Sequence, residues 1–381
     1  MSVFGLNRAF QPKSLAVVGA GPDRGSLGGA VFANLRSAGF PGRIDPINPR
    51  HSEIAGQACF SSIEKLEAAP DLLVVATPAA TLPEITRQAV RRGVGAAIVL
   101  TAGLGHGEGS LADEMHSIAR AGSLRIIGPN CLGVLAPHAN LNASFAAVMP
   151  RAGQIAVISQ SGAIAAAMAE WGHLRGIGFS AIVSLGDQVD VDLGDLLDYF
   201  ALDRATQAIL LYVESIKDAR KFMSAARAAS RAKPVVVIKS GRHAQGAKAA
   251  ATHTGALAGS DAVYDAAFRR AGLLRVYDMA ELFAPQLQDG FLRSQEQRIA
   301  RAAPRSEGRN RDQCDEGPRE HHDARWRVDE DDGQRGPGMV GNRAGKAQRV
   351  LGAYVICNRC QPPQHDERGD GCDRDARPCG R

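Results

Sequence analysis

A histidine among hydroxyls and small residues is the feature of this chain that best suits chemistry. His253 lies in the run Thr252-His253-Thr254-Gly255, between a strand-like segment and a helical one. Neutral imidazole is nucleophilic near pH 7, so a histidine in such a loop can accept and pass on a phosphoryl group. The alternative is a loop histidine capped by its neighbours, and the choice depends on what surrounds it.

Two strand ends offer groups that could serve this histidine. In Ser159-Gln160-Ser161-Gly162, an apolar run leads into two hydroxyls and a glycine before a helical pattern, which predicts an anion cradle at a helix N-terminus. A simple serine N-cap is the alternative. The run Ile209–Val213 ends on Glu214, whose carboxylate could fix the tautomer of an imidazole and stabilise its cation. The alternative for Glu214 is a solvated strand end.

A glycine-bearing turn near the N-terminus indicates a nucleotide site. Glycines between Gly19 and Gly28 would let the backbone approach a phosphate, although the spacing departs from G-x-G-x-x-G. The second strand ends on Asn48-Pro49-Arg50, where an NAD site would have an acid. Because Arg50 could pair with a ribose phosphate, CoA or NADP fits better than NAD. The alternative is a turn that only packs helix on strand.

The first 290 residues alternate short apolar runs with helical patterns, which is typical of parallel sheets covered on both faces. Residues 136 to 151 show no period and are interpreted as a connection. The predicted strands are Ser14–Val18, Ile44–Ile47, Leu72–Ala76, Ala96–Thr101, Arg125–Ile127, Gln154–Ile158, Phe179–Ser184, Ala208–Val213 and Pro234–Lys239. The predicted helices include Leu82–Arg92, Leu111–Ala121, Ala163–Leu174, Leu193–Leu202, Lys217–Ala232 and Asp261–Ala271.

The sequence after about residue 290 differs in kind. From Phe291 to Arg381 it has 17 Arg and one Lys, and apolar periodicity vanishes. Such a composition predicts disorder, and its abrupt onset favours an out-of-frame reading of a GC-rich gene over a natural tail. A zinc site at Cys357, Cys360, Cys372 and Cys379 is disfavoured because the second pair is too widely spaced. No metal site is predicted.

Taken in order, these segments resemble the α-subunit module of the NDP-forming acyl-CoA synthetases, the superfamily that includes succinyl-CoA synthetase. The resemblance covers about residues 4 to 283 and is carried by the segments 14–29, 127–131, 158–162, 190–197, 212–215 and 252–259. It implies an α/β fold with a Rossmann-like CoA-binding domain at 1–150 and a flavodoxin-like ligase domain at 151–288. Residues 289–381 would then be a disordered tail, in a chain truncated or frameshifted after about residue 284.

The resemblance also implies roles for individual residues. His253 would be the phosphorylated histidine, and Glu214 would be the carboxylate that steadies it. The phosphate would be bound by Ser159, Gln160, Ser161, Gly162, Thr254 and Gly255. CoA would be bound by Gly19, Gly21, Arg24, Gly25, Ser26, Gly28, Asn48, Arg50, Thr101 and Asn130. Cys131 is interpreted as a packing residue and not as a nucleophile.

The family pattern is incomplete in this chain, since no ATP-grasp glycine loop or metal carboxylates can be found. ATP or ADP with Mg²⁺ would therefore need an ATP-grasp β-subunit or domain, and an oligomer is expected. The alternatives are a non-catalytic CoA-binding remnant, the regulatory region of a protein acetyltransferase fusion, and an NADP-dependent oxidoreductase. A net charge of +5 gives no indication of nucleic acid or membrane partners. The absence of a signal-peptide pattern and the placement of cysteines predict a cytoplasmic protein.

Overall fold

A computed structural model describes residues 3–241, 260–278 and 281 of the chain. His253, Thr254 and Gly255 lie outside the described residues. The predicted disordered or out-of-frame tail and its cysteines also lie outside them. Within the described residues, no helix has both the length and the apolar character needed to cross a bilayer.

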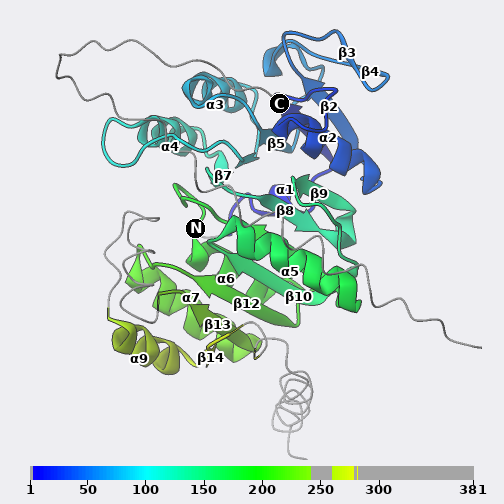
Figure 1. The fold of residues 1–381 in the computed structure, drawn as a ribbon. Helices are drawn as coiled ribbons and strands as arrows, with labels where there is room; N and C mark the ends of the chain where they lie inside the picture. Colours follow the sequence, from blue (N-terminus) through cyan, green and yellow to red (C-terminus); the bar gives the residue numbers. More distant parts are fainter. Residues whose placement is uncertain (1–2, 242–259, 279–280, 282–381) are drawn as a thin grey trace, which may run out of the picture. The chain divides into compact units, whose positions relative to one another are not determined.

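The first part of the chain forms a five-stranded parallel sheet (Figure 1). Its strand order is β2 (Arg43–Ile47), β1 (Ser14–Val18), β5 (Leu72–Val75), β6 (Ala96–Val99) and β7 (Arg125–Ile127). The strands are short and buried, as parallel strands covered on both faces must be. The sequence therefore predicted these five strands correctly, with end points that shift by at most two residues.

Helices cover both faces of this sheet. Alternate strand residues such as Val17 and Val74 face α1 (Asn7–Phe10) and α2 (Leu27–Ser37), whereas Val18 and Val75 face α3 (Leu82–Arg91) and α4 (Leu111–Ala121). This alternation follows from the two-residue period of a strand. Small elements complete the region, namely β3 (Glu53–Ile54), β4 (Gln57–Ala58), η1 (Ile63–Lys65) and η2 (Ala79–Thr81).

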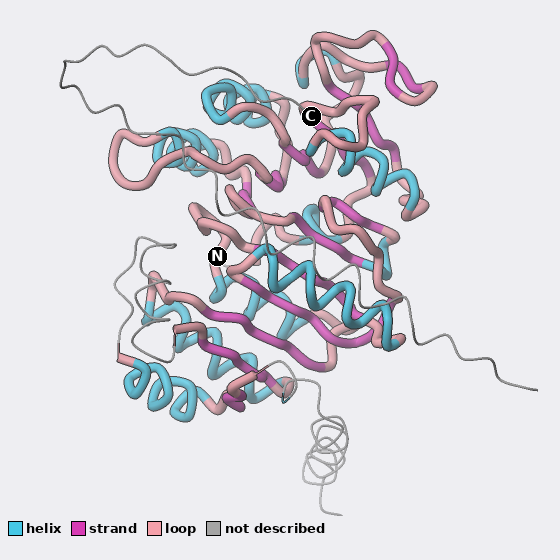
Figure 2. Tube along the Cα trace, in the orientation of Figure 1, coloured by secondary structure: helices cyan, strands magenta, loops and turns pink. Residues whose placement is uncertain are grey.

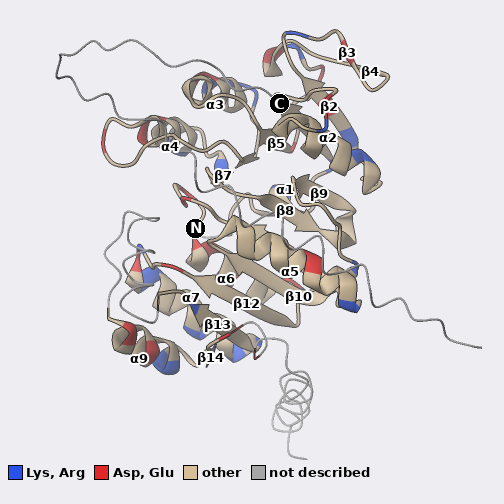
Figure 3. Cartoon of the chain, viewed as in Figure 1, with Lys and Arg blue, Asp and Glu red and all other residues tan. Residues whose placement is uncertain are grey.

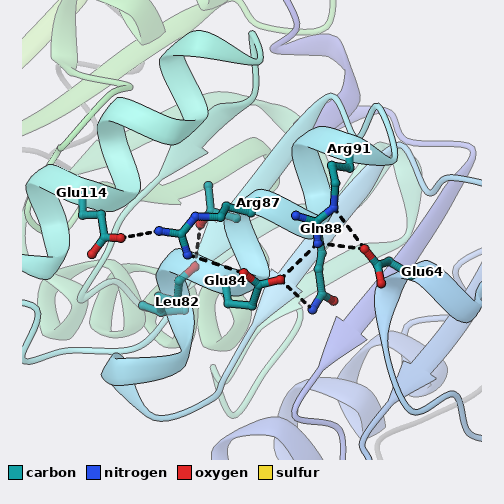
Figure 4. A network of polar contacts seen from close by, with 8 residues as sticks. Glu64, Leu82, Glu84, Arg87, Gln88, Arg91 and Glu114 are labelled. Carbon is teal, nitrogen blue, oxygen red and sulfur yellow. Dashed lines mark hydrogen bonds and ion pairs between the residues drawn. The ribbon is translucent and has the colours of Figure 1, made fainter.

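An exposed ion-pair network joins the helices on the outer face (Figure 4). Arg87 of α3 reaches Glu114 of α4 across 2.5 Å, and Arg91 pairs with Glu64 of η1 at 2.8 Å and with Glu84 at 3.1 Å. Hydrogen bonding to Arg91 lowers the pKa of Glu84. Because all these groups are in water, salt screens their contribution to stability, and the buried apolar faces hold the helices.

The second part of the chain forms a seven-stranded mixed sheet. Its strand order is β14 (Leu274–Val276), β13 (Val235–Lys239), β12 (Ala208–Val213), β10 (Ala152–Ser159), β11 (Phe179–Ser184), β8 (Gly133–Ala136) and β9 (Leu141–Ser144). The first five of these strands are parallel, and β8 and β9 are antiparallel. This is the flavodoxin-like arrangement that the resemblance implied, extended by a two-stranded addition.

The second sheet is also covered on both faces (Figures 1 and 2). One face packs on α5 (Gly162–Arg175) through residues such as Val157 and Met168. The other face packs on α6 (Leu193–Leu202), α7 (Ala219–Ala232) and α9 (Asp261–Ala271), with Ile158 and Phe222 among the contacts. The α5 to α7 helices and α9 were predicted with end points that shift by at most two residues.

The interpretation of residues 136 to 151 as a connection was partly wrong, because Leu141–Ser144 form β9. The strands β8 and β9 are short. Antiparallel pairing of β8 with β11, and of β9 with β8, places them in a sheet whose other members lie later in the chain. The chain therefore changes sheets between Ile127 and Gly133. The domain division at residues 150 and 288 stays a prediction.

Candidate functional site

Both sheets reverse their strand order at a point where the predicted site residues gather. In the first sheet the chain runs from β1 to β2 on one side and then to β5 on the other. In the second sheet it runs from β10 to β11 and then to β12 on the opposite side. Loops diverge at such points and leave a crevice outside the carboxyl ends of the strands, where open α/β sheets bind ligands.

The glycine turn of the first sheet follows β1 at this switch point. Gly19 has φ +90°, and a Cβ there would lie 2.4 Å from the carbonyl oxygen of Ala76 after β5. A Cβ on Gly28 would lie 1.9 Å from the carbonyl oxygen of Gly19, so only glycine allows α2 to approach the turn this closely. These two glycines thus allow helix and strand to pack closely, as the alternative interpretation requires, and they bring the start of α2 against the turn that follows β1.

The other residues of the turn remain open to solvent. Arg24, Gly25 and Ser26 are exposed, and the Ser26 hydroxyl caps α2 by accepting the N–H of Gly29 at 3.2 Å. A capped helix N-terminus beside an exposed guanidinium favours an anion. The chemistry of this turn therefore fits a phosphate-bearing ligand such as CoA.

Residues from neighbouring strand ends lie beside this turn. The side-chain amide of Asn48, after β2, donates to the carbonyl of Ala20 at 2.7 Å, and its oxygen accepts the N–H of Arg50 at 3.0 Å. Arg50 itself is exposed. The structure thus brings Asn48 against the glycine turn, and the Arg50 backbone follows directly. The sequence spacing indicated this arrangement because parallel strands end at one edge.

Thr77 is a residue that sequence reasoning missed. It follows β5 at the switch point, and its carbonyl accepts the hydroxyl of Thr101, after β6, at 2.7 Å. The carbonyl of Thr101 in turn accepts the N–H of Asn130 at 2.9 Å. A chain of contacts therefore runs along the carboxyl edge from β5 to the end of β7. Thr77 directly follows an apolar run in the sequence, and this position is the signal by which it could have been identified.

The connection from β7 to β8 lies between the two switch points. Asn130 is exposed and donates its side-chain amide to the Asp187 carboxylate, after β11, at 3.1 Å. The N–H of Leu132 donates to the Ser184 hydroxyl at 3.0 Å, and a Cβ on Gly162 would lie 3.5 Å from that Leu132 nitrogen. Residues predicted to bind CoA and residues predicted to bind phosphate thus flank one short segment.

Cys131 in this segment is buried and belongs to the core. Its thiol donates to the carbonyl of Val99 at 3.3 Å. Burial raises the pKa of the thiol to about 12, so almost no thiolate forms at neutral pH. The interpretation of Cys131 as a packing residue is therefore confirmed.

The second switch point holds the predicted phosphate cradle. Ser159 pairs with Tyr212 in the β10–β12 register, so these two strands end side by side. The buried Ser159 hydroxyl accepts the N–H of Ser161 at 3.1 Å and donates to the Ser161 carbonyl at 2.7 Å, which closes the turn. The Ser161 hydroxyl caps α5 by accepting the N–H of Ile164 at 3.4 Å. The N-cap interpretation holds, and this capped terminus stays open to an anion.

Gln160 joins the ends of β10 and β12. Its side chain is buried, and its Oε1 accepts the backbone N–H groups of Glu214 and of Ser215, the latter at 3.0 Å. Its Nε2 donates to the carbonyl of Ser215 at 2.8 Å. The amide therefore fixes the backbone that carries Glu214. The phosphate contact that the resemblance implied for Gln160 stays a prediction.

Lys239 is a second residue that the sequence did not single out. It ends β13 beside Val213, next to Glu214, and is buried. Its ammonium lies 4.7 Å from the ring centre of Tyr264 in α9, and burial lowers its pKa. In the sequence, residues 242–259, which include His253, stand between the end of β13 and the start of α9. A cation thus lies beside the end of β12 that carries Glu214.

Models of two families match consecutive parts of the chain. A CoA binding domain matches residues 13–137, and a succinyl-CoA ligase like flavodoxin domain matches residues 152–285. These matches support the two α/β units of the fold in the order that the sequence predicted.

Curated relatives match the same region. The chain is 43% identical over 272 residues to an ADP-forming acetate–CoA ligase of Methanocaldococcus jannaschii, covering 71% of this chain and 38% of that protein. It is 41% identical over 285 residues to the α subunit of the ADP-forming acetate–CoA ligase I of Pyrococcus furiosus, covering 73% of this chain and 62% of that subunit. The chain thus spans less than two thirds of the length of these relatives.

A solved structure of another protein is also similar to this chain. The dinucleotide-forming acetyl-coenzyme A synthetase 1 of Ca. Korarchaeum cryptofilum, in complex with phosphate and ADP, aligns with a TM-score of 0.69 and 38% identity. The alignment covers 72% of this chain and 60% of that chain.

Proposed function

Because the chain belongs to the superfamily of NDP-forming acyl-CoA synthetases, we propose that it is the α-type module of such a ligase. In this role it binds CoA at the first switch point. It relays phosphate from an acyl phosphate to a nucleotide through a phosphohistidine at His253.

The observation that carries this proposal is that Ser161 and Glu214 follow two neighbouring strands, β10 and β12, at one switch point. The N-terminus of α5 and the end of β12 lie at the same edge, and Gln160 holds the two strand ends together. An anion at the helix terminus and a carboxylate beside it suit a histidine that alternates between neutral and phosphorylated forms. The segment that holds His253 is joined to the next strand, β13.

The proposed reaction has two steps at this module. Phosphate oxygen attacks the acyl carbonyl of acyl-CoA, the C–S bond breaks, and CoA thiolate leaves while an acyl phosphate forms. The imidazole of His253 then attacks the phosphorus, the P–O bond to the acyl group breaks, and the free acid leaves as a carboxylate. Glu214 accepts the hydrogen bond of the second imidazole nitrogen and stabilises the positive charge that develops.

The last step of the family reaction needs a nucleotide site that this module would not supply. We propose that an ATP-grasp subunit or domain binds ADP with Mg²⁺ and receives the phosphoryl group from His253. The similarity to an α subunit and to a structure that holds phosphate and ADP supports such a partner. The acetyl group is the acyl substrate of these relatives, and a small acyl-CoA is the first substrate to test here.

The test is incorporation of labelled phosphate. The full chain is incubated with acetyl-CoA and ³²P-phosphate, quenched in alkali, and the acid-labile label is mapped by mass spectrometry. We expect label on His253, none in His253→Ala, and a drop of at least tenfold in Glu214→Gln, because the amide cannot stabilise the imidazolium.

CoA binding is measured on the same proteins by calorimetry. Both variants should bind CoA as the intact chain does, since neither residue is among those proposed to bind CoA. Equal labelling of His253→Ala would refute the phosphohistidine assignment. CoA binding without any label on the intact chain would instead favour the non-catalytic alternative.

A further inference from the structure

Lys239, the last residue of β13, is a buried cation outside any ion pair with the described acidic residues. It is only 7% exposed. Its ammonium group donates to the carbonyl of Ser240 and lies 4.7 Å from the ring centre of Tyr264. A buried charge of this kind is costly to fold, and such groups gather at functional sites. Lys239 lies at the edge of the sheet that holds Glu214, beside the proposed catalytic site.

On one side, the contacts of Lys239 lead to the backbone of Glu214. Lys239 pairs with Val213 in the register of β12 and β13, and the N–H of Ser240 donates to the carbonyl of Val213 at 2.9 Å. The ammonium of Lys239 binds the carbonyl of the same Ser240. Because Glu214 directly follows Val213, these bonds hold its backbone from the side of β13. Gln160 holds it from the side of β10.

On the other side, the contacts of Lys239 lead to the start of α9. Lys239 lies on the same face of β13 as Val237, since the two are separated by one strand period, and Tyr264 of α9 packs against this core. The face of the aromatic ring attracts the ammonium. Arg275 of β14, also buried, pairs with Asp261 at 2.5 Å. Figure 3 shows the acidic first half of α9 in red. Two neighbouring strands thus each hold the start of α9 by a buried cation.

The end of β13 and the start of α9 are the two described points between which His253 stands in the sequence. We infer that Lys239 is a positioning residue of the phosphoryl relay, because its ammonium joins both points to the backbone that carries Glu214. The inference rests on the proposed function, in which the imidazole of His253 must meet that carboxylate. Small errors in the placement of reacting groups cost rate steeply. Lys239 itself forms no bond in the reaction and transfers no proton.

The charges around Lys239 suit this role. Burial lowers its pKa, Asp261 raises it, Arg275 lowers it, and Glu214 raises it. The two carboxylates thus act on the lysine from α9 and from β12, the two elements that it joins. Both favour the ammonium form, which the contact with the Tyr264 ring needs.

The experiment measures the rate at which labelled phosphate enters His253 of the full chain, with acetyl-CoA as the acyl donor. Lys239→Leu removes the ammonium and keeps an apolar side chain, and we expect it to slow labelling by about tenfold or more. Lys239→Arg keeps a cation that stacks on an aromatic ring, so it should restore most of the rate. All variants should bind CoA as the intact chain does, since Lys239 is not among the residues proposed to bind CoA.

Lys233→Leu is the matched control, because it removes a lysine just before the other end of β13. Lys233 is also partly buried, and its ammonium donates to the carbonyls of Phe200 and Asp203. Its loss should lower the free energy of unfolding, measured with urea, and leave the labelling rate within about twofold of the intact chain. An equal loss of labelling in Lys233→Leu and Lys239→Leu would show that lost stability is the cause and would overturn the inference.

Tyr264→Leu tests the same contact from the side of α9. It should slow labelling as Lys239→Leu does, and the double variant should be no slower than either single variant, because both remove one contact. Labelling of Lys239→Leu at the rate of the intact chain would overturn the inference alone. Absence of label on the intact chain would overturn the proposed function, and the inference with it.

Discussion

Gln160 shows how one buried side-chain amide can fix the backbone of a site whose proposed chemistry belongs to other residues. All three of its described side-chain hydrogen bonds go to the backbone of Glu214 and Ser215. Buried polar groups must be satisfied, so the amide and the strand end specify each other's position. A carboxylate at this point would repel the Ser215 carbonyl, and an ammonium group would offer no acceptor to the two N–H groups.

Cys131 gives a prediction about pH at the same scale. Burial raises its pKa from 9.0 to about 12. Below pH 9 the thiol is protonated in both the folded and the unfolded chain, so its full contribution to stability is present. Between pH 9 and 12 the unfolded chain loses this proton first, and the contribution decreases. We therefore expect the free energy of unfolding, measured with urea, to fall more between pH 8 and pH 10.5 in the intact chain than in Cys131→Ala.

Alkylation tests the burial of the Cys131 thiol more directly. With iodoacetamide at pH 8, Cys131 should stay unmodified in the folded chain while half-buried Cys59 reacts slowly, and both should react in urea. Rapid modification of Cys131 in the folded chain would contradict its assignment as a packing residue.

At the scale of elements, a buried ion-pair network joins the end of the first sheet to α6 and α7. Arg125 of β7 contacts Asp190 at 2.9 Å and Asp195 at 3.2 Å, and Lys221 of α7 contacts Asp195 at 2.8 Å. Asp195 also completes a capping box with Asp192 at the start of α6. One carboxylate thus serves a helix cap and the junction of two sheets. The sequence singled out this segment only through the resemblance.

Removal of this carboxylate should destabilise the chain strongly. The Asp195 side chain is only 3% exposed and Arg125 only 12%. Asp195→Ala removes one half of the capping box of α6 and the buried carboxylate shared by Arg125 and Lys221, which keep only the more exposed Asp190 and Asp192. We expect a loss of about 3 kcal/mol in the free energy of unfolding, measured with urea. Glu108→Ala, which removes an exposed carboxylate, should change it by less than about 0.5 kcal/mol. A similar loss in both variants would show that the network is not the cause.

At the scale of the whole molecule, the two sheets share one core in the described part of the chain. Phe10 of α1 stacks on Tyr199 of α6 with ring centres 4.7 Å apart, and Asn34 of α2 donates to the carbonyls of Ser144 and Ala146 at 2.9 Å. The two switch points are therefore held in a fixed relation by apolar contacts as well as by the Arg125 network. This suits a proposed reaction that passes an acyl group from one point to the other.

The placement of β8 and β9 leads to a prediction about fragments. A fragment of residues 151–288 lacks these strands and exposes the edge of β11, whereas a fragment of residues 130–288 retains them. We expect the longer fragment to show a cooperative thermal transition at a temperature at least 10 °C higher, because it buries more apolar surface. Circular dichroism measures the transition temperature of each fragment. Equal temperatures would place the domain boundary near residue 150, as the sequence predicted.

The sequence by itself determined the order and type of the elements. The alternation of β-branched runs with helical patterns predicted nine strands of the two sheets to within two residues at either end, because periodicity is a local property. It also indicated the glycine turn after β1, the hydroxyl turn after β10 and the carboxylate after β12. These signals were local as well, since each turn follows directly on its strand.

Only the tertiary structure decided which of these turns meet. Strand order is set by non-local packing, so the sequence alone did not show that β10 neighbours β12 or that β1 neighbours β5. The short strands β8 and β9 were missed because their pattern is weak and because β11, the strand that joins β8 to the rest of the sheet, lies about 40 residues later. The roles of Thr77, Gln160 and Lys239 depend on contacts across strand ends. Those contacts exist only once the sheets have formed.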